Sequence, residues 1–399
     1  ILKIMVFLLS SKNICNYLKK KNICPEIKQE LNEHNIESRS AKNFNLLVSL
    51  PDHSKLFVKQ ERFDREGKTA GEFNREWRIQ EFVKQFPAVS KLNSWLPEIT
   101  DFDVDNSILI VKYLDDHQNL GEFYGQENIF APEIASSIGS IIATIHSQTI
   151  NNPSYENFFG YSNSNSSPKL TQGMARGLAR ITPEIFGTVP ADGLKFFALY
   201  QRYDSLGKAI AQLNESFQPA CLTHNDLKLN NILIAANWKP TSTSLAANYN
   251  QPQVELKLID WERSGWGDPA FDLGTVIGSY LIIWLQSLIV SRSMAIDESL
   301  RLATIPLEVL QPSLAALSKT YAACFPDIVE HDPKFWQKVM QFAGFALIQS
   351  IQSTLQYQKA FNNTGICMLQ VAKALLCNPE SSIASVLGIE LDQLDPCKS

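Results

Sequence analysis

Apolar residues occupy every second position from Phe44 to Leu50, which is the pattern of a half-buried β-strand. A turn signature, Pro-Asp-His-Ser, follows at residues 51–54, and residues 56–59 resume the extended pattern. A second apolar run, residues 107–111, is typical of a buried strand. The pattern therefore predicts a β-hairpin near the N-terminus, joined later by at least one more strand.

Helical spacing replaces this alternation at two places. Phe73 and Trp77, with apolar residues after them, predict a helix over residues 72–83. An isoleucine stripe from Ile134 to Ile145, ending at His146, predicts a second helix. Residues 151–168 are rich in Asn, Ser and Pro and are expected to form a loop.

Two short strands are then expected at residues 232–234 and 254–259, on either side of a polar insertion at residues 239–253. Beyond Gly274 the pattern is almost wholly helical. The apolar stretch 275–290 contains polar residues and is short for a bilayer span, so it is interpreted as a buried core helix. Residues 5–9 are likewise too short for the apolar region of a signal peptide.

Composition excludes several classes of function. The chain of 399 residues is 45% hydrophobic, enough for a substantial core shared by two lobes. Lys and Arg number 36 against 41 Asp and Glu, a net charge of −5, so no large positive field is available for a nucleic acid. Seven cysteines without paired Cys-x-x-Cys spacing argue against a disulfide framework and a zinc site, and favour a cytoplasmic location. No nucleic acid and no membrane is expected as a partner.

The residues most informative about chemistry lie at 221–234 and 256–262. Asp226 is followed five positions later by Asn231 on a segment that leads into a strand, and Asp260 ends the next strand. Phosphoryl transfer needs a group that accepts the proton of the attacking hydroxyl and a divalent metal that neutralises the phosphate oxygens. A carboxylate at this position could accept the proton, and the amide and carboxylate oxygens could bind the metal. Hard oxygen ligands of this kind suit Mg²⁺.

In this order the motifs resemble the aminoglycoside phosphotransferase and choline kinase superfamily, relatives of the protein kinases. The resemblance rests on a His-x-Asp-x4-Asn pattern at 224–231, Ile-Asp-Trp-Glu at 259–262, Gly-Asp-Pro-Ala-Phe-Asp-Leu at 267–273 and the helix at 138–146. It implies an α+β, two-lobed, protein-kinase-like fold. An N-terminal lobe of antiparallel sheet with one helix would span residues 1–110, a hinge 111–116, and a larger, mostly helical lobe 117–399, with ATP and magnesium between the lobes.

The resemblance also implies the roles of individual residues. Asp226 would be the catalytic base, and Asn231 and Asp260 would be the magnesium ligands. Lys59 would hold the α- and β-phosphates of ATP. Its helix partner would be Glu76, with Glu72 and Glu81 as alternatives.

The adenine would meet the backbone of the hinge, which includes Val111 and Tyr113. Because strand side chains alternate, Phe57 faces the same side as Lys59, where it would cover the base.

Two departures from the family pattern change this picture. Residues 38–43, between the first two strands, contain no glycine, so side chains must hold the phosphates where a glycine-rich turn otherwise would. Lys228 stands where small-molecule kinases usually carry His and Ser/Thr protein kinases carry Lys. Its ammonium could contact the γ-phosphate. Asn225 replaces an arginine that reads activation-loop phosphorylation, so that form of control is not expected.

Other residues have structural interpretations. His224 and His146 are expected to bond core groups, and Asp272 to brace the catalytic loop through backbone hydrogen bonds. In a degenerate homologue, Asp226, Asn231 and Asp260 would only cap loops.

Three functions remain open: a kinase for a small-molecule hydroxyl, a Ser/Thr kinase that modifies a ribosomally made peptide, and a nucleotide-binding scaffold without turnover. The sequence does not identify the acceptor. Asp327, Glu330 and Asp332 could meet a cationic acceptor or could be a solvated surface.

Overall fold

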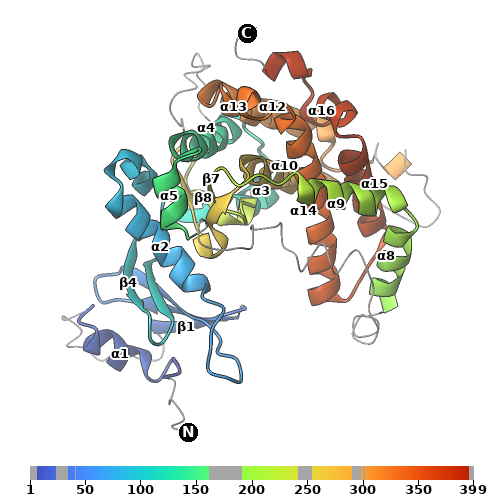
Figure 1. The fold of residues 1–399 in the computed structure, drawn as a ribbon. Helices are drawn as coiled ribbons and strands as arrows, with labels where there is room; N and C mark the ends of the chain where they lie inside the picture. The colour runs from blue at the N-terminus through green and yellow to red at the C-terminus, as the bar shows by residue number, and fades with distance from the viewer. Residues whose placement is uncertain are drawn as a thin grey trace. The chain divides into compact units, whose positions relative to one another are not determined.

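The computed structural model describes residues 7–23, 35–40, 42–160, 191–240, 254–289, 298–299 and 302–394. The chain divides into two compact units, which are coloured by residue number in Figure 1. The first, here the sheet unit, comprises Ile1–Asn119, Leu233–Trp238 and Lys257–Ser264. The second, the helical unit, comprises Leu120–Ile232, Lys239–Leu256 and Gly265–Ser399.

The sheet unit is built on a five-stranded antiparallel sheet with strand order β1-β2-β3-β5-β4. Its elements in chain order are α1 (Ile14–Lys20), β1 (Ile36–Ser40), β2 (Phe44–Ser49), β3 (Lys55–Gln60), α2 (Glu72–Gln85), the 3-10 helix η2 (Pro87–Ser94), β4 (Ile99–Asp103) and β5 (Ile108–Lys112). The expected hairpin is β2 and β3, and the expected helix is α2.

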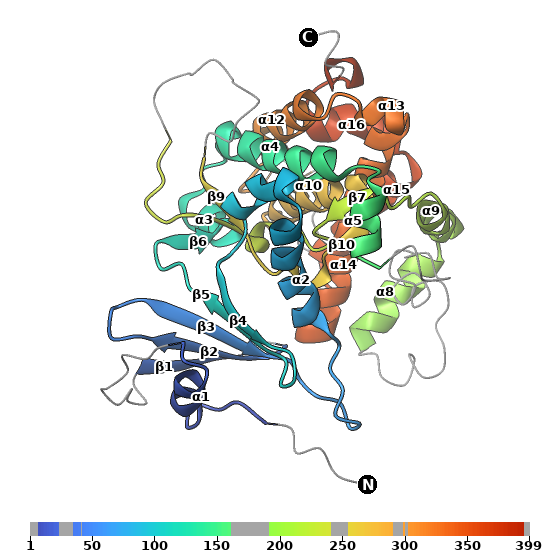
Figure 2. The same ribbon diagram turned by 60° about the vertical axis from the view of Figure 1, so that its left-hand side comes forward.

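Alternation gives this sheet two different faces. One face carries Leu46, Val48, Val58 and Ile110, which pack with residues of α1 into a buried core. The other carries Leu109 and Val111, which pack with Phe73 of α2. Figure 2 shows α1 beside β1 and β2. Because β3 alternates, Phe57 and Lys59 lie on the α2 face while Leu56 and Val58 enter the α1 core.

A second, three-stranded sheet brings distant parts of the chain back to the sheet unit. It has the order β6-β8-β9, from β6 (His117–Asn119), β8 (Ile232–Ala235) and β9 (Leu256–Leu258). The 3-10 helix η4 (Trp261–Arg263) follows β9. The buried Trp261 indole donates to the Leu258 carbonyl at 2.9 Å, which fixes the chain just after Asp260. This return is decided by tertiary contacts and not by local pattern.

Where the structure describes it, the helical unit contains helices and one small two-stranded sheet, β7 (Cys221–Thr223) with β10 (Gly265–Gly267). Its described helices are α3 (Leu120–Glu127), α4 (Pro132–Thr149), α5 (Pro153–Phe158), α8 (Ala191–Gln201), α9 (Asp204–Glu215), η3 (Leu229–Asn231), α10 (Pro269–Gln286), α12 (Leu307–Cys324), α13 (Ile328–His331), α14 (Phe335–Gln358), α15 (Asn363–Cys377), α16 (Pro379–Leu387) and η5 (Leu391–Leu394).

Close helix packing forms the core of the helical unit. A Cβ on Gly139 of α4 would lie 2.4 Å from the Leu317 carbonyl oxygen of α12, so only glycine permits this approach. A Cβ on Gly278 of α10 would likewise lie 2.7 Å from the Cβ of Ala346 of α14. The chain uses glycine at these two helix crossings to bring the backbones together.

The α+β class and the division into a sheet-bearing and a mostly helical part are confirmed. The stretch 275–290 belongs largely to α10, whose residues 269–281 are buried. Two expectations were wrong: the sheet unit has a second helix, α1, besides the one helix expected there, and residues 153–158 form α5 within the expected loop. Asn152 caps that helix, accepting from Ser154 N at 3.0 Å. The polar insertion lies mostly outside the described residues, and the hinge at 111–116 stays a prediction.

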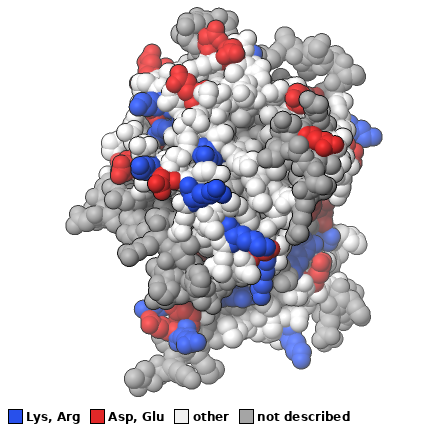
Figure 3. Space-filling view, turned by 90° about the vertical axis from the view of Figure 1, so that its right-hand side faces the viewer, with Lys and Arg blue, Asp and Glu red and all other residues white. Residues whose placement is uncertain are grey.

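Charge is mixed on the surface. The face drawn in Figure 3 carries Lys and Arg groups beside Asp and Glu groups, so it presents no uniform field of one sign. Among the residues that the structure describes, none of the helices combines the length and the apolar character that a membrane crossing demands.

Candidate active site

Lys59 is the central charge of the sheet unit. It lies near the end of β3, is only 9% exposed, and its ammonium contacts two carboxylates. Lys59 Nζ is 2.6 Å from Asp260 Oδ1 and 3.4 Å from Glu76 Oε2. We call Lys59, Glu76 and Asp260 the lysine group. It joins residues 201 positions apart in sequence through one buried cation.

The structure distinguishes the three glutamates considered as partners of Lys59. Glu76 is buried on α2 and reaches the ammonium. Glu72, one turn earlier, instead pairs with Lys42 of the turn between β1 and β2. Glu81 is exposed. Of the three, Glu76 is therefore the one that contacts Lys59.

Burial and charge act against each other in the lysine group. Burial disfavours the Lys59 ammonium, but attraction to Glu76 and Asp260 outweighs it and raises the pKa of Lys59. Burial also raises the pKa of Glu76 to about 7, because Lys59 offsets only part of the desolvation and the acidic neighbours Asp260 and Glu262 add to it. The pKa of Glu262 is raised by burial and by the same crowding of carboxylates. Two carboxyl groups thus face one ammonium in the lysine group.

The residues expected to meet the adenine share the α2 face of the sheet. Phe57 lies opposite Val111 in the β3–β5 ladder, and its ring is 6.3 Å from that of Tyr113. Val111 is buried against Phe73, and the Tyr113 N–H donates to the Lys55 carbonyl at 2.8 Å. The N–H of Tyr113 is therefore already used inside the sheet unit. Only Phe57 and Tyr113 of this set are partly exposed.

Sequence reasoning missed Arg39 on the same face. Its guanidinium carbon lies 5.4 Å from the centre of the Tyr113 ring, a cation–π distance. Arg39 belongs to β1, inside the glycine-free segment 38–43, of which Ala41 lies outside the described residues. The absence of glycine in that segment was the signal that could have directed attention to this side chain.

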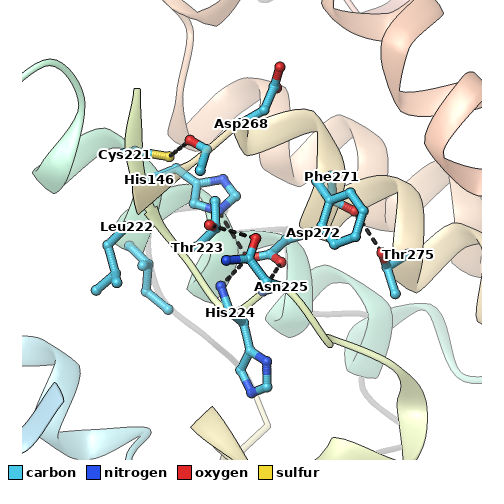
Figure 4. A network of polar contacts seen from close by, with 12 residues as sticks. His146, Cys221, Leu222, Thr223, His224, Asn225, Asp268, Phe271, Asp272 and Thr275 are labelled. Carbon is cyan, nitrogen blue, oxygen red and sulfur yellow. Dashed lines mark hydrogen bonds and ion pairs between the residues drawn. The ribbon is translucent and has the colours of Figure 1, made fainter. Parts of the chain in front are cut away.

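In the helical unit, residues 224–228 connect β7 to η3. This segment contains the expected base and is here called the catalytic loop. Asp272 of α10 receives the backbone N–H groups of His224 at 2.7 Å and of Asn225 at 2.8 Å (Figure 4). His146 Nε2 lies 3.4 Å from the same carboxylate, and His146 Nδ1 lies 2.9 Å from the Tyr321 hydroxyl. All of these side chains are buried apart from Asn225. The expected roles of Asp272 as a brace and of His146 as a structural residue are confirmed by these contacts.

The brace allows an unusual backbone just before Asp226. Asn225 has φ +62°, in the left-handed region, which Asn tolerates better than most residues. Asp226 and Lys228 then lie together, with Lys228 Nζ 3.1 Å from Asp226 Oδ2.

Asn231 fixes the Asp226 end of the loop. Its amide nitrogen donates to the Asp226 carbonyl at 2.8 Å and lies 3.3 Å from Asp226 Oδ2. Both contacts use the amide nitrogen, so the amide oxygen is the end that a metal ion could take. The sequence predicted a catalytic role for these two residues. In the structure they are also joined by a hydrogen bond across the loop.

Asp260 repeats this backbone feature in the sheet unit. Its φ is +61° and its ψ is +54°, again left-handed, between β9 and η4. The turn leaves its side chain 40% exposed while one oxygen binds Lys59. Strained backbone at a polar residue is common at functional sites.

The donors fit magnesium better than a transition metal. Across the described ranges, no group of three or more His, Cys, Asp or Glu side chains is placed to hold a metal ion. Asp260 offers a carboxylate oxygen and Asn231 an amide oxygen. Mg²⁺ prefers oxygen ligands and binds few of them from protein, so each of these oxygens is of a type that it accepts.

Asp268 begins α10 and connects it to α14. It accepts from Ala270 N at 3.0 Å as the helix cap and from Gln218 N at 3.0 Å, and it binds Lys338 Nζ at 2.6 Å. Lys338 is buried and also binds Asp332 at 2.8 Å. Asp332 thus pairs with a lysine that Asp268 also binds.

A known protein family matches part of the chain. Residues 121–283 match the family model for choline/ethanolamine kinase. This kinase segment contains the catalytic loop, Asp260 and Asp272. The match confirms the resemblance expected from the sequence, and with it the kinase class of transferase. No curated protein matches the chain.

Solved structures resemble the chain distantly. An ADP-bound aminoglycoside phosphotransferase APH(2'')-Ib has 15% identity and a TM-score of 0.47, with 90% of this chain and 98% of that chain covered. The choline kinase LicA from Streptococcus pneumoniae has 14% identity and a TM-score of 0.37, with coverage of 90% and 98%. The amicoumacin kinase hAmiN, solved with AMP-PNP and Ca²⁺, has 11% identity and a TM-score of 0.48, with coverage of 92% and 95%.

Proposed function

We propose that this protein transfers the γ-phosphate of ATP, bound with magnesium, to a hydroxyl group of a small molecule. The observation that carries the proposal is the catalytic loop, in which Asp226 is held by Asn231 from one side while Asp272 braces the preceding backbone. The match of residues 121–283 to choline/ethanolamine kinase supports the same class of acceptor.

Asp226 acts as the base in this proposal. Its carboxylate accepts the proton of the acceptor hydroxyl as the new P–O bond forms and the bond to ADP breaks. Lys228, 3.1 Å from that carboxylate, offers its ammonium to the γ-phosphate oxygens as they gain charge. Because the loop is fixed through its backbone, both side chains keep their positions without being buried.

The lysine group serves the nucleotide. Lys59 holds the α- and β-phosphates, Glu76 keeps the lysine extended, and Phe57 and Tyr113 cover the base. Asp260 in the sheet unit and Asn231 in the helical unit are the proposed magnesium ligands. Magnesium, when bound, neutralises phosphate charge.

A second acceptor class is favoured by Lys228. A lysine two positions after the base is the choice of Ser/Thr protein kinases, and here it does contact the base. The alternative is therefore a Ser/Thr kinase that acts on a ribosomally made peptide. The two candidates differ in the acceptor and share every residue of the phosphate chemistry.

The experiment is transfer of labelled γ-phosphate to a panel of acceptors: choline, ethanolamine, an aminoglycoside and a Ser/Thr-containing peptide. Asp226→Asn keeps the shape of the side chain and removes its basicity, so it should lower kcat by about a hundredfold or more while Mg·ATP still binds. Asp204→Asn, an exposed aspartate at the start of α9, is the matched control and should leave kcat unchanged.

Labelling of one of the small molecules, lost in Asp226→Asn, supports the proposal. Labelling of the peptide alone selects the alternative. Equal transfer by wild type and Asp226→Asn would overturn the assignment of the base. Nucleotide binding without transfer to any acceptor would favour the scaffold.

A further inference from the structure

Helix α2 carries Glu76, yet its first turn lacks a cap of its own. The preceding residue is Gly71, with φ +69° and no side chain, so no local group accepts the first N–H groups of the helix. Uncapped N–H groups at a buried helix start are costly. A carboxylate from elsewhere in the sheet unit takes that place.

The carboxylate is that of Glu61, the residue immediately after β3. Glu61 Oε1 accepts from Glu72 N at 2.8 Å, and Oε2 lies 3.5 Å from Phe73 N. The hydroxyl of Ser107 donates to the same Oε2 at 2.5 Å. Glu61 is 3% exposed, so its carboxyl group lies in the interior at the positive end of the helix dipole.

Glu61 therefore connects the end of β3 to the start of α2. These two elements carry Lys59 and Glu76, so their relative position decides whether the two side chains meet. Glu61 lies two residues after Lys59 on one side and binds the N-terminus of the helix that carries Glu76 on the other. Ser107, whose φ of +46° is left-handed, anchors the carboxylate to the turn between β4 and β5. Lys42, in the turn between β1 and β2, also contacts the start of α2 by pairing with the Glu72 side chain.

We propose that Glu61 is a positioning residue for the nucleotide site: by capping α2, it holds Glu76 against Lys59 in the free protein. The inference rests on the proposed function, because it assigns Glu61 a part in ATP binding. Its consequence is that α2 is fixed by the fold, so Mg·ATP binds without a partner or a modification that moves this helix.

The neighbouring residue provides a matched control. Gln60 is 2% exposed, and its side chain also makes three hydrogen bonds: to Phe7 O at 2.8 Å, to Asn106 O at 3.0 Å and from Leu9 N at 2.7 Å. Two of these contacts hold the N-terminal segment, the third holds the turn between β4 and β5, and none of them involves α2. Gln60→Ala and Glu61→Ala thus remove similar numbers of buried bonds from adjacent positions.

The experiment compares thermal unfolding with the KM values for ATP and for the acceptor in wild type, Gln60→Ala, Glu61→Ala and Glu61→Gln. Both alanine variants should lower Tm. Only Glu61→Ala should also raise the KM for ATP, by about tenfold, with the acceptor KM unchanged. Gln keeps one acceptor oxygen but turns an NH₂ group toward Phe73 N, so Glu61→Gln should lie between wild type and Glu61→Ala.

Hydrogen exchange of the α2 amides gives a readout that does not need turnover. Exchange in the first turn of α2 should quicken in the Glu61 variants and not in Gln60→Ala. An unchanged KM for ATP in the Glu61 variants, or an equal rise in Gln60→Ala, would overturn the positioning role. Should Glu61→Ala fail to fold, Glu61→Gln decides in the same way. Absence of Mg·ATP binding by wild type would instead refute the proposed function, and α2 exchange would still test the cap.

Discussion

The lysine group and the catalytic loop are held in place by opposite means. In the lysine group, charged side chains hold one another: Lys59 and Glu76 are buried, and their pKa values are shifted. In the catalytic loop, the backbone is held by Asp272 while Lys228 stays 50% exposed. A change in the lysine group should therefore alter stability and nucleotide affinity together, whereas a change at the tip of the loop should alter turnover alone.

Removal of Asp260 should have the largest effect. Asp260→Ala deletes the charged member of the proposed magnesium ligands, so magnesium-dependent binding of ATP should fall below detection in titration calorimetry. Asp105→Ala, an exposed aspartate in the turn before β5, should bind like wild type. Equal affinities of wild type and Asp260→Ala would mean that Asp260 serves only to pair with Lys59, and the scaffold interpretation would gain.

The two lysines sharpen the comparison further. Lys59→Ala should weaken ATP affinity and destabilise the fold by about 3 kcal/mol, because it leaves Glu76 buried without its cation. Protonation of Glu76 would reduce that cost. Lys228→Ala should lower kcat by about tenfold and leave Tm and ATP affinity unchanged, because it removes charge stabilisation only as the phosphoryl group moves.

The predictions for Lys59→Ala and Lys228→Ala are checked by measuring the single-turnover rate and the Mg·ATP affinity of both variants. If Lys228→Ala raised only the KM for ATP, or had no effect, Lys228 would face solvent or the acceptor. The peptide alternative would then lose its sequence support.

The smallest effect concerns the pH dependence of stability. The folded protein holds the Glu76 proton up to a pKa of about 7, against an ordinary value of 4.5, so it binds more protons than the unfolded chain between these pH values. The Glu76 contribution to stability is thus fully present below pH 4.5 and is lost as pH rises through 7. It should be on the order of 1 to 3 kcal/mol.

Urea unfolding at pH 5 and pH 7.5 tests this sign. In Glu76→Gln, which cannot ionise, the loss of stability between the two pH values should be smaller than in wild type. An identical loss in both proteins would mean that Glu76 is ionised throughout this range and that its burial is fully offset by Lys59.

Local pattern was sufficient for much of the fold. The alternation near Phe44 predicted the β2–β3 hairpin, and helical spacing of Phe73 and Trp77 predicted α2, because periodicity depends on which face is buried. It missed α1 and α5, which are short and leave few periods to read. The sequence also indicated that Asp226 and Asn231 belong together, and the structure joins them by a hydrogen bond.

The sequence by itself determined which residue types are available for phosphate chemistry and their order along the chain. Only the tertiary structure decided their partners. It selected Glu76 over Glu72 and Glu81, paired Asp332 with Lys338, and placed Glu61 at the start of α2. The physical reason is that these bonds join side chains far apart in sequence, up to 201 positions for Lys59 and Asp260. Burial, which sets the strength and the protonation of such pairs, exists only once the chain has folded.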